Sequence, residues 1–246
     1  MRNVFQTLRY VLPLGLLITV TGCATTDGQV SIFSSSSDTV KIPAEVKSHY
    51  ASVVDGGFKL PAVDVASIDK KYWRQIVNYH SKYPAGTIVV QTKDRFLYLI
   101  LNDNKAIRYG VGVGKAGLEF KGNAVIGAKV KWPHWSPTKD MMVRDPDRYG
   151  HIKGMNAGVD NPLGARALYL YKDGHDTCFR IHGSHEDWSI GKAMSSGCIR
   201  MLNQDVMDLF NRVKVGTKVI ILSGNDKPES DITDGMKIGT DGAVIN

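Results

Sequence analysis

The chain of 246 residues contains only three cysteines, and it lacks an apolar run long enough to span a membrane as a helix. A transmembrane helix needs about 20 consecutive apolar residues, whereas the run from Val11 to Val20 is shorter and contains Pro13. The sequence also has no internal repeat and no cluster of lysines and arginines with interleaved aromatics. These absences argue against a repeat protein and against a nucleic-acid-binding protein.

The composition is otherwise ordinary for a globular protein, with 43% apolar and 22% charged residues. The formal net charge is +7. A positive surface favours nucleic acid, anionic lipid or an anionic polymer as a partner, although a soluble basic surface without a dedicated partner is the simpler interpretation.

The first 22 residues have the features of an export signal. Arg2 and Arg9 form a positive region around the start of the apolar run, and secretory signals carry an apolar run of about 7–15 residues. The run leads into VTGC at positions 20–23, which resembles a bacterial lipobox. This resemblance implies that residues 1–22 are a lipoprotein signal peptide and that Cys23 is lipidated. An ordinary signal peptide with an incidental cysteine is the alternative.

Removal of residues 1–22 reduces the 31 basic residues to 29, so the mature chain with its 24 acidic residues has a net charge of +5. Residues 23–40 are polar and contain four consecutive serines, which is typical of a flexible tether. Residue 24 is alanine rather than aspartate, which by resemblance to lipoproteins favours the outer membrane. We therefore expect a periplasmic, lipid-anchored protein with no nucleic-acid partner.

Residues 41–85 are predicted to form an N-terminal extension that contains a short helix. We place this helix from Asp69 to His80, because Asp69 can cap it and because Trp73 and Ile76 recur at helical spacing.

Strand signals dominate the next part of the chain, residues 86–223. Short β-branched and aromatic runs alternate with turn residues, which is typical of an antiparallel meander. Residues 114–165 are rich in glycine, proline and polar residues, and we interpret them as a long functional loop such as a lid. Residues 224–246 form a polar tail. The predicted strands are Thr87–Gln91, Phe96–Leu101, Ala106–Gly112, Ala167–Tyr171, Thr177–His182 and Lys218–Leu222.

One clear helix is predicted between Asn203 and Gly216. Asn203 is a good cap, and Asp205 suits the first turn of a helix. The apolar residues at helical spacing are Val206, Leu209, Phe210 and Val213.

Two short segments carry residues with reactive side chains, IHGS at 181–184 and SSGCIR at 195–200. A thiol attacks a carbonyl as its thiolate, and its ordinary pKa is about 8.5. An imidazole such as that of His182 can take the proton from Cys198 and return it to a leaving amine. Gly197 permits a tight turn, and the amides of Gly197 and Cys198 can face an oxyanion.

These segments resemble the catalytic domain of L,D-transpeptidases, the YkuD-type domain. The family pattern is His-Gly-Thr, a further glycine, Ser-His-Gly-Cys-Ile-Arg, a helix and a Gly-Thr strand. The resemblance covers about residues 86–223 and implies a mostly β fold, sandwich-like or barrel-like, with a helix after the nucleophile. The matching stretches are NPLGAR at 161–166, HGS at 182–184, Gly191, SSGCIR at 195–200 and Gly216-Thr217.

The resemblance also implies roles for individual residues. Cys198 would be the nucleophile, His182 its base, and the carbonyl of Gly183 would orient the imidazole. The chain departs from the family at Ser184, where many members have Thr, and at Ser196, where many have His. Because the family's base matches His182, we expect the Ser196 variant to be active. By the same resemblance, carbapenems should acylate the enzyme.

Four residues are candidate substrate contacts, namely Arg200, Ser195, Ser196 and Trp135. Arg200 can clamp a substrate carboxylate or carbonyl, or it can form a structural ion pair. Trp135 lies in a rigid aromatic segment that either walls a substrate groove or caps the core. His182 and His185 lack an evident third ligand, so we expect no metal, and we expect no other cofactor.

Cys178 raises the alternative that it forms a disulfide with Cys198 after export. It lies four residues before His182 on one predicted strand, about 13 Å away at about 3.3 Å per residue. A disulfide needs Cα atoms within about 7 Å. If His182 contacts Cys198, Cys178 is too far away, and we predict that Cys178 is a small core residue.

The leading interpretation is an acyltransferase of cell-wall cross-linking or remodelling. By the resemblance, Cys198 attacks the carbonyl of diaminopimelate in a peptidoglycan tetrapeptide stem, releases D-Ala and passes the acyl group to an amine. That amine belongs to another stem or to an envelope protein. The second interpretation is an L,D-carboxypeptidase or amide hydrolase of the same fold. The third is a non-catalytic murein-binding lipoprotein, against which the intact His182, Gly197, Cys198 and Arg200 count.

Overall fold

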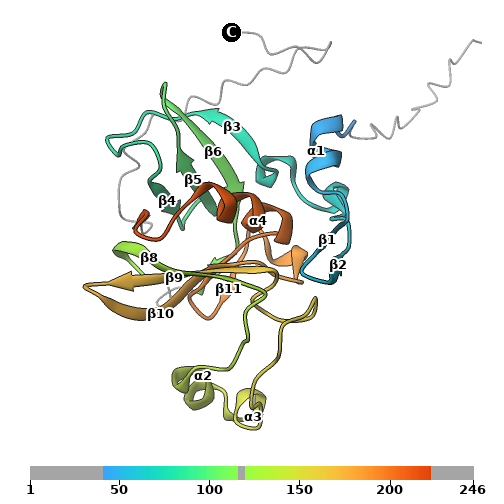
Figure 1. Ribbon diagram of the computed structural model, residues 1–246, viewed down its shortest axis with the longest axis vertical. Helices are drawn as coiled ribbons and strands as arrows, with labels where there is room; N and C mark the ends of the chain where they lie inside the picture. The colour runs from blue at the N-terminus through green and yellow to red at the C-terminus, as the bar shows by residue number, and fades with distance from the viewer. Residues whose placement is uncertain (1–40, 116–119, 223–246) are drawn as a thin grey trace, which may run out of the picture. The chain divides into compact units, whose positions relative to one another are not determined.

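The computed structural model describes residues 41–115 and 120–222 (Figure 1). The predicted signal peptide, the serine-rich tether with Cys23, and the polar tail lie outside the described residues. Among the residues described, no helix combines the length and the apolar character that crossing a bilayer requires.

Nine strands of the described residues form one mixed sheet. Strands β4, β5 and β6 pair in antiparallel fashion, which confirms the predicted meander. Strand β13 is parallel to β4 and antiparallel to β8, and β12 is parallel to β10. In spatial order the strands are β12 (Ile199–Arg200), β10 (His175–His182), β9 (Arg166–Lys172), β8 (Gly122–Lys131), β13 (Lys218–Leu222), β4 (Ile88–Gln91), β5 (Phe96–Ile100), β6 (Lys105–Gly110) and β3 (Gln75–Asn78).

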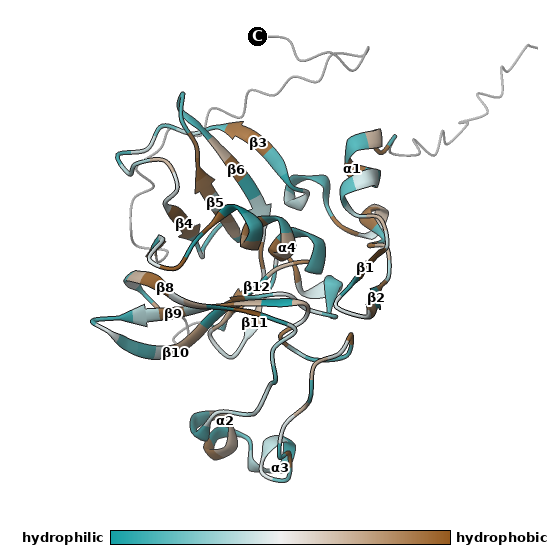
Figure 2. Cartoon of the chain, in the orientation of Figure 1, coloured by the Kyte–Doolittle hydropathy of each residue, from teal (hydrophilic) through white to brown (hydrophobic). Residues whose placement is uncertain are grey.

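The main core lies between this sheet and the helix α4 (Asn203–Arg212). In Figure 1, α4 lies between strands β4–β6 and strands β8–β10, and Figure 2 shows β4 and β5 as strongly apolar. Both halves of the sheet contribute fully buried side chains to one cluster, such as Leu97 of β5 and Leu168 of β9. Helix α4 contributes Leu209 to the same cluster. Each buried side chain of this size contributes about 1.5–3 kcal/mol by removal from water. The mostly β fold with a helix after Cys198 is therefore confirmed.

The predicted helix from Asp69 to His80 is wrong. Asp69 does cap a turn, by accepting from the amide of Lys71, but the turn is a 3-10 helix of three residues, Lys70–Tyr72. The chain then becomes β3 and pairs with β6 at the edge of the sheet. Two β-branched residues in β3 favour a strand, and pairing with a neighbouring strand outweighs their helical spacing. The short helix of the extension is α1, Ala44–His49.

Residues 114–165 are more regular than predicted. The ten-residue strand β8 lies within the sheet, between β13 and β9. Its glycines and lysines obscured the strand pattern in the sequence. Gly127 is a glycine because of packing, since a Cβ atom there would lie only 2.1 Å from the ring of Tyr171. Helices α2 (Lys139–Arg144) and α3 (Pro146–Tyr149) follow in the connection from β8 to β9 (Figure 1). Among the described residues of this stretch, most of the irregular ones follow β8.

The N-terminal extension packs on the sheet domain through a hairpin, β1 (Val53–Asp55) and β2 (Phe58–Leu60). Both oxygens of Asp55 accept from the buried guanidinium of Arg166 at 2.8 Å, and Trp132 Nε1 donates to Asp55 at 2.7 Å. Arg166 lies in the family-like segment NPLGAR, so this segment also holds the extension.

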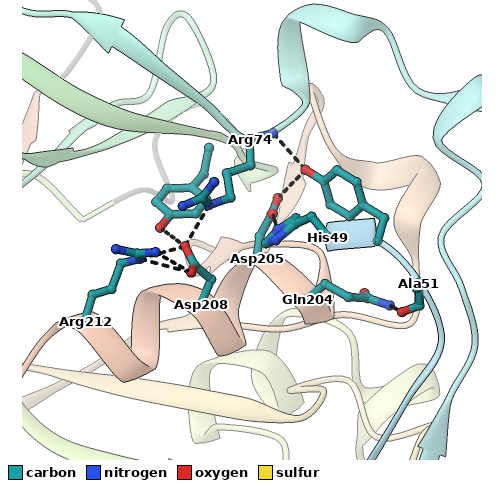
Figure 3. Close-up of polar contacts among 9 residues, drawn as sticks. His49, Ala51, Arg74, Gln204, Asp205, Asp208 and Arg212 are labelled. Atoms are coloured by element: carbon teal, nitrogen blue, oxygen red, sulfur yellow. Dashed lines mark hydrogen bonds and ion pairs between the residues drawn. The ribbon is translucent and has the colours of Figure 1, made fainter. Parts of the chain in front are cut away.

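A second contact joins the extension to α4 (Figure 3). The carboxylate of Asp205 is fully buried, with His49 Nε2 at 2.8 Å and the donating hydroxyl of Tyr50 at 3.2 Å. Burial raises the pKa of Asp205, and the contacts with His49 and Tyr50 oppose that rise. On the next turn, Asp208 accepts from Arg74 Nε at 2.8 Å. Burial of a carboxylate is costly unless it is paired, so these bonds fix α4 against the extension.

Candidate active site

The two reactive segments lie side by side in the parallel pair of β10 and β12. Ile181 is the partner of Ile199, and His182 is the partner of Arg200. Both isoleucines are buried in the core. Because side chains alternate along strands, His182 and Arg200 lie together on the other face. One step earlier, Cys198 lies beside Arg180, so the register brings the candidate thiol and imidazole to the same corner of the sheet.

His182 is held in one tautomer. Its Nδ1 lies 2.6 Å from the carbonyl oxygen of Gly183, as the resemblance implied. A carbonyl only accepts, so Nδ1 carries the proton and Nε2 keeps a lone pair. The side chain is 5% exposed. Burial lowers the pKa of His182 to about 4, with a smaller contribution from the charge of Arg200. At neutral pH the imidazole is therefore neutral and can accept a proton.

Cys198 is partly buried and lies near two arginines. Burial raises its pKa, and the amide of Arg180 together with the guanidinium groups of Arg180 and Arg200 opposes the rise. A raised pKa favours the protonated thiol. Attack then needs the base to remove that proton.

The turn before Cys198 is braced by Ser195. Its hydroxyl donates to the carbonyl of Cys198 at 2.5 Å and accepts from the amide of Gly197 at 3.2 Å. The side chain of Ser195 is buried, whereas Ser196 is exposed. Gly197 has a φ of +122°, which glycine adopts readily. The expectation that the amide of Gly197 faces an oxyanion is not met, because this amide is bonded to Ser195. The amide of Cys198 remains the candidate donor.

Asn203 bonds to the segments at 161–166 and 181–184, and its expected role as a helix cap is wrong. Residue Leu202 occupies the cap position, without a side-chain hydrogen bond. Asn203 instead donates to the carbonyl of Ser184 at 2.8 Å and accepts from the amide of Ala165 at 2.9 Å. A Cβ atom at Gly183 would lie 2.2 Å from Asn203 Oδ1. The glycine after His182 is therefore required by close packing, which fixes the position of the Gly183 carbonyl.

Arg200 forms an ion pair, the alternative that the sequence left open, and its partner is Glu186, which the sequence did not identify. Its Nη1 lies 2.5 Å from Glu186 Oε2, and the two side chains are 22% and 30% exposed. Arg180, also missed, pairs with both oxygens of Asp176 at 2.7 and 2.8 Å. Several acidic residues precede Cys198, and the sequence contains no signal that selects Glu186 among them.

Trp135 is partly buried and lies in the connection between β8 and β9. Its amide donates to Met155 O at 2.9 Å and its carbonyl accepts from Met155 N at 2.7 Å. Its ring lies 6.4 Å from that of Tyr149. These contacts are local to the connection.

Cys178 is exposed, so the expectation of a core residue is wrong. Its φ is +61°, and it lies where the pairing of β9 and β10 shifts register between Asp176 and Arg180. A local irregularity of this kind disrupts the regular alternation of side chains along a strand. Both Cys178 and Cys198 are free thiols.

Comparison with known proteins places this geometry in a family context. Residues 85–221 match the family model YkuD, the L,D-transpeptidase catalytic domain. Among curated proteins, the probable L,D-transpeptidase ErfK/SrfK of Escherichia coli K12 is 34% identical over 139 residues, covering 55% of this chain and 43% of the relative. The probable L,D-transpeptidase YbiS of the same organism is 31% identical over 137 residues, covering 54% and 43%. The chain spans about half the length of the curated relatives it matches.

Solved structures are similar as well. A Brucella melitensis protein, described as a probable carnitine operon oxidoreductase, is 52% identical, with coverage of 65% of this chain and 99% of that chain and a TM-score of 0.43.

Proposed function

Because the chain belongs to the YkuD family of L,D-transpeptidase catalytic domains, we propose that it transfers a peptidoglycan stem through a thioester on Cys198. The donor is a tetrapeptide stem, and the acceptor is an amine on a second stem or on an envelope protein. The relatives' names support the family and the stem-peptide substrate, and the residues around Cys198 support the chemistry.

In the proposed reaction, Cys198 attacks the carbonyl of diaminopimelate, the third residue of the stem. His182 Nε2 takes the thiol proton as the carbon–sulfur bond forms. The bond to D-Ala then breaks, and His182 returns the proton to the departing amine of D-Ala. An acceptor amine next attacks the thioester, loses a proton to His182, and forms an amide while the thiol is restored. No metal or organic cofactor enters these steps.

One observation carries this proposal, namely an imidazole whose Nδ1 is bonded to Gly183 and whose strand partner, Arg200, lies two residues after Cys198. The hydrogen bond to Gly183 orients His182, and burial keeps its pKa near 4. Binding of murein alone would not need a buried base of this kind, which counts against a non-catalytic binding lipoprotein. Hydrolysis would use the same thioester, so the acceptor has to be identified by its product.

We expect the product to be a new amide rather than a free carboxylate. Water is present at about 55 M, so an amine competes only if it is held in place, and orientation on an enzyme can be worth an effective molarity of about 10⁵ M or more. Mature protein should be incubated with disaccharide-tetrapeptide, with and without an added D-amino acid. Transfer yields cross-linked dimer or exchanged stem together with free D-Ala. Tripeptide alone, unchanged by the added amine, would support the hydrolase instead.

We also propose that Cys23 carries lipid and anchors the protein in the periplasm, at the outer membrane. The sequence VTGC and the serine-rich residues that follow support this proposal. In detergent partitioning, wild type is expected in the detergent phase and Cys23→Ser in the aqueous envelope fraction. Equal release of both proteins into the soluble fraction would contradict lipidation.

A further inference from the structure

Hydrogen bonds of the backbone hold both members of the Arg200–Glu186 ion pair in place. Arg200 exchanges backbone hydrogen bonds with Gly112 at 2.8 and 2.9 Å. The amide of Glu186 donates to Ser184 Oγ at 2.9 Å, and its carbonyl accepts from the amide of Ser189 at 2.9 Å. Both backbones are therefore fixed, while the two charged groups remain partly open to solvent.

Arg200 lies next to one reacting group in the sheet and two residues from the other. Arg200 is the strand partner of His182, and its positive charge acts on the pKa values of both His182 and Cys198. A partly exposed ion pair contributes little to stability. Stabilisation of the fold therefore does not explain why the carboxylate of Glu186 is held next to Arg200.

The second arginine beside Cys198 differs in this respect. Arg180 is occupied on both nitrogens by Asp176 and its guanidinium stacks 3.9 Å from the centre of the Tyr169 ring. Arg200 has one nitrogen bonded to Glu186, and a guanidinium has five N–H donors. Arg200 can therefore bind a second carboxylate without leaving Glu186.

We propose that Arg200 and Glu186 together recognise a zwitterionic α-amino acid group on the side chain of the donor. Arg200 binds the carboxylate and Glu186 binds the ammonium. The side chain of diaminopimelate ends in such a group, whereas the side chain of lysine ends in an ammonium alone. This inference rests on the proposed function, because it assigns the donor residue of that same site.

The test compares three tetrapeptide donors that differ only at the third residue. They contain diaminopimelate, diaminopimelate acetylated on its side-chain amine, or lysine. The measured quantities are kcat/KM for D-Ala release and the thioester on Cys198, detected by mass spectrometry. Wild type is expected to prefer the unmodified donor over the acetylated one by at least about tenfold, because a site built for a charged group rejects an analogue that lacks it.

Glu186→Gln should remove this preference and bring the ratio of the two diaminopimelate donors close to one. The ratio should change because the rate on the unmodified donor falls. Asp187→Asn alters the neighbouring carboxylate and serves as the matched control, with the preference retained. Arg200→Lys keeps the charge but loses the planar fork, so it should lose activity on both diaminopimelate donors relative to the lysine donor.

Two contrary results have different meanings. If no donor forms a thioester on Cys198 in wild type, the proposed function fails. If the thioester forms but wild type does not distinguish the acetylated donor, the inference alone is overturned. The inference is likewise overturned if Glu186→Gln lowers the rate on all three donors equally, since Glu186 would then only hold Arg200 in position.

Discussion

Replacement of Cys198 by alanine is expected to abolish D-Ala release and thioester formation, by roughly 10⁴-fold or more. Loss of a nucleophile removes the covalent route entirely, and enzymes that lose theirs retain only the contribution of binding and of the oxyanion site. Cys198 is partly exposed and its side chain is small, so the variant should keep its fold. A loss of activity can thus be attributed to the missing sulfur.

Acylation by a carbapenem offers a direct measurement of this loss. Intact-protein mass spectrometry should detect one adduct on wild type and none on Cys198→Ala. Cys178→Ala is the matched control, because Cys178 is a second free thiol that is more exposed, and it should keep the adduct. An adduct that persists in Cys198→Ala and disappears in Cys178→Ala would show that Cys178 is the reactive thiol and would contradict the prediction.

Local patterns in the sequence predicted much of the sheet and the position of the two reactive segments. Strand β13 was predicted with the observed bounds, Lys218–Leu222, because a short β-branched run follows a glycine turn. Helix α4 was predicted from apolar residues at helical spacing, all of which face the core. The hydrogen bond from His182 to Gly183 was expected from the family resemblance. These features depend on neighbouring residues, so the sequence contains them directly.

Features that depend on distant partners could not be predicted in this way. Asn203 resembles a cap by type and position, but its side chain bonds to Ser184 and Ala165 instead. Strand β8 lies within the sheet, yet its own residues carry a weak pattern. The exposure of Cys178 follows from a shift in strand register. In each case the deciding contact joins segments that are far apart in sequence.

Burial of His182 lowers its pKa and thereby makes both stability and the acylation rate depend on pH. The pKa of His182 is about 4 in the folded protein, below its ordinary value of 6.5. Between these two values the unfolded chain binds a proton that the folded chain does not, so stability is lost as pH falls through this window and is regained above about pH 6.5. In the folded protein, the imidazole of His182 stays mostly neutral between pH 6.5 and its pKa of about 4. The rate of Cys198 acylation should therefore hold down to about pH 5 in protein that remains folded and fall as pH approaches 4.

Replacement of His182 by alanine is expected to reduce acylation by roughly 10²–10⁴-fold, the usual effect of losing a general base. Because this side chain is buried, part of the loss with alanine could arise from a cavity. His182→Gln is therefore the companion variant, since it fills the space and can donate to Gly183 but cannot take the thiol proton. Ser196→Ala is the control within the same motif, and its exposed hydroxyl should matter much less. Single-turnover acylation by the tetrapeptide donor, followed at pH 7, separates the variants. Equal losses in His182→Gln and Ser196→Ala would contradict the assignment of the base, whereas a loss confined to the His182 variants identifies the imidazole as the group that removes the thiol proton.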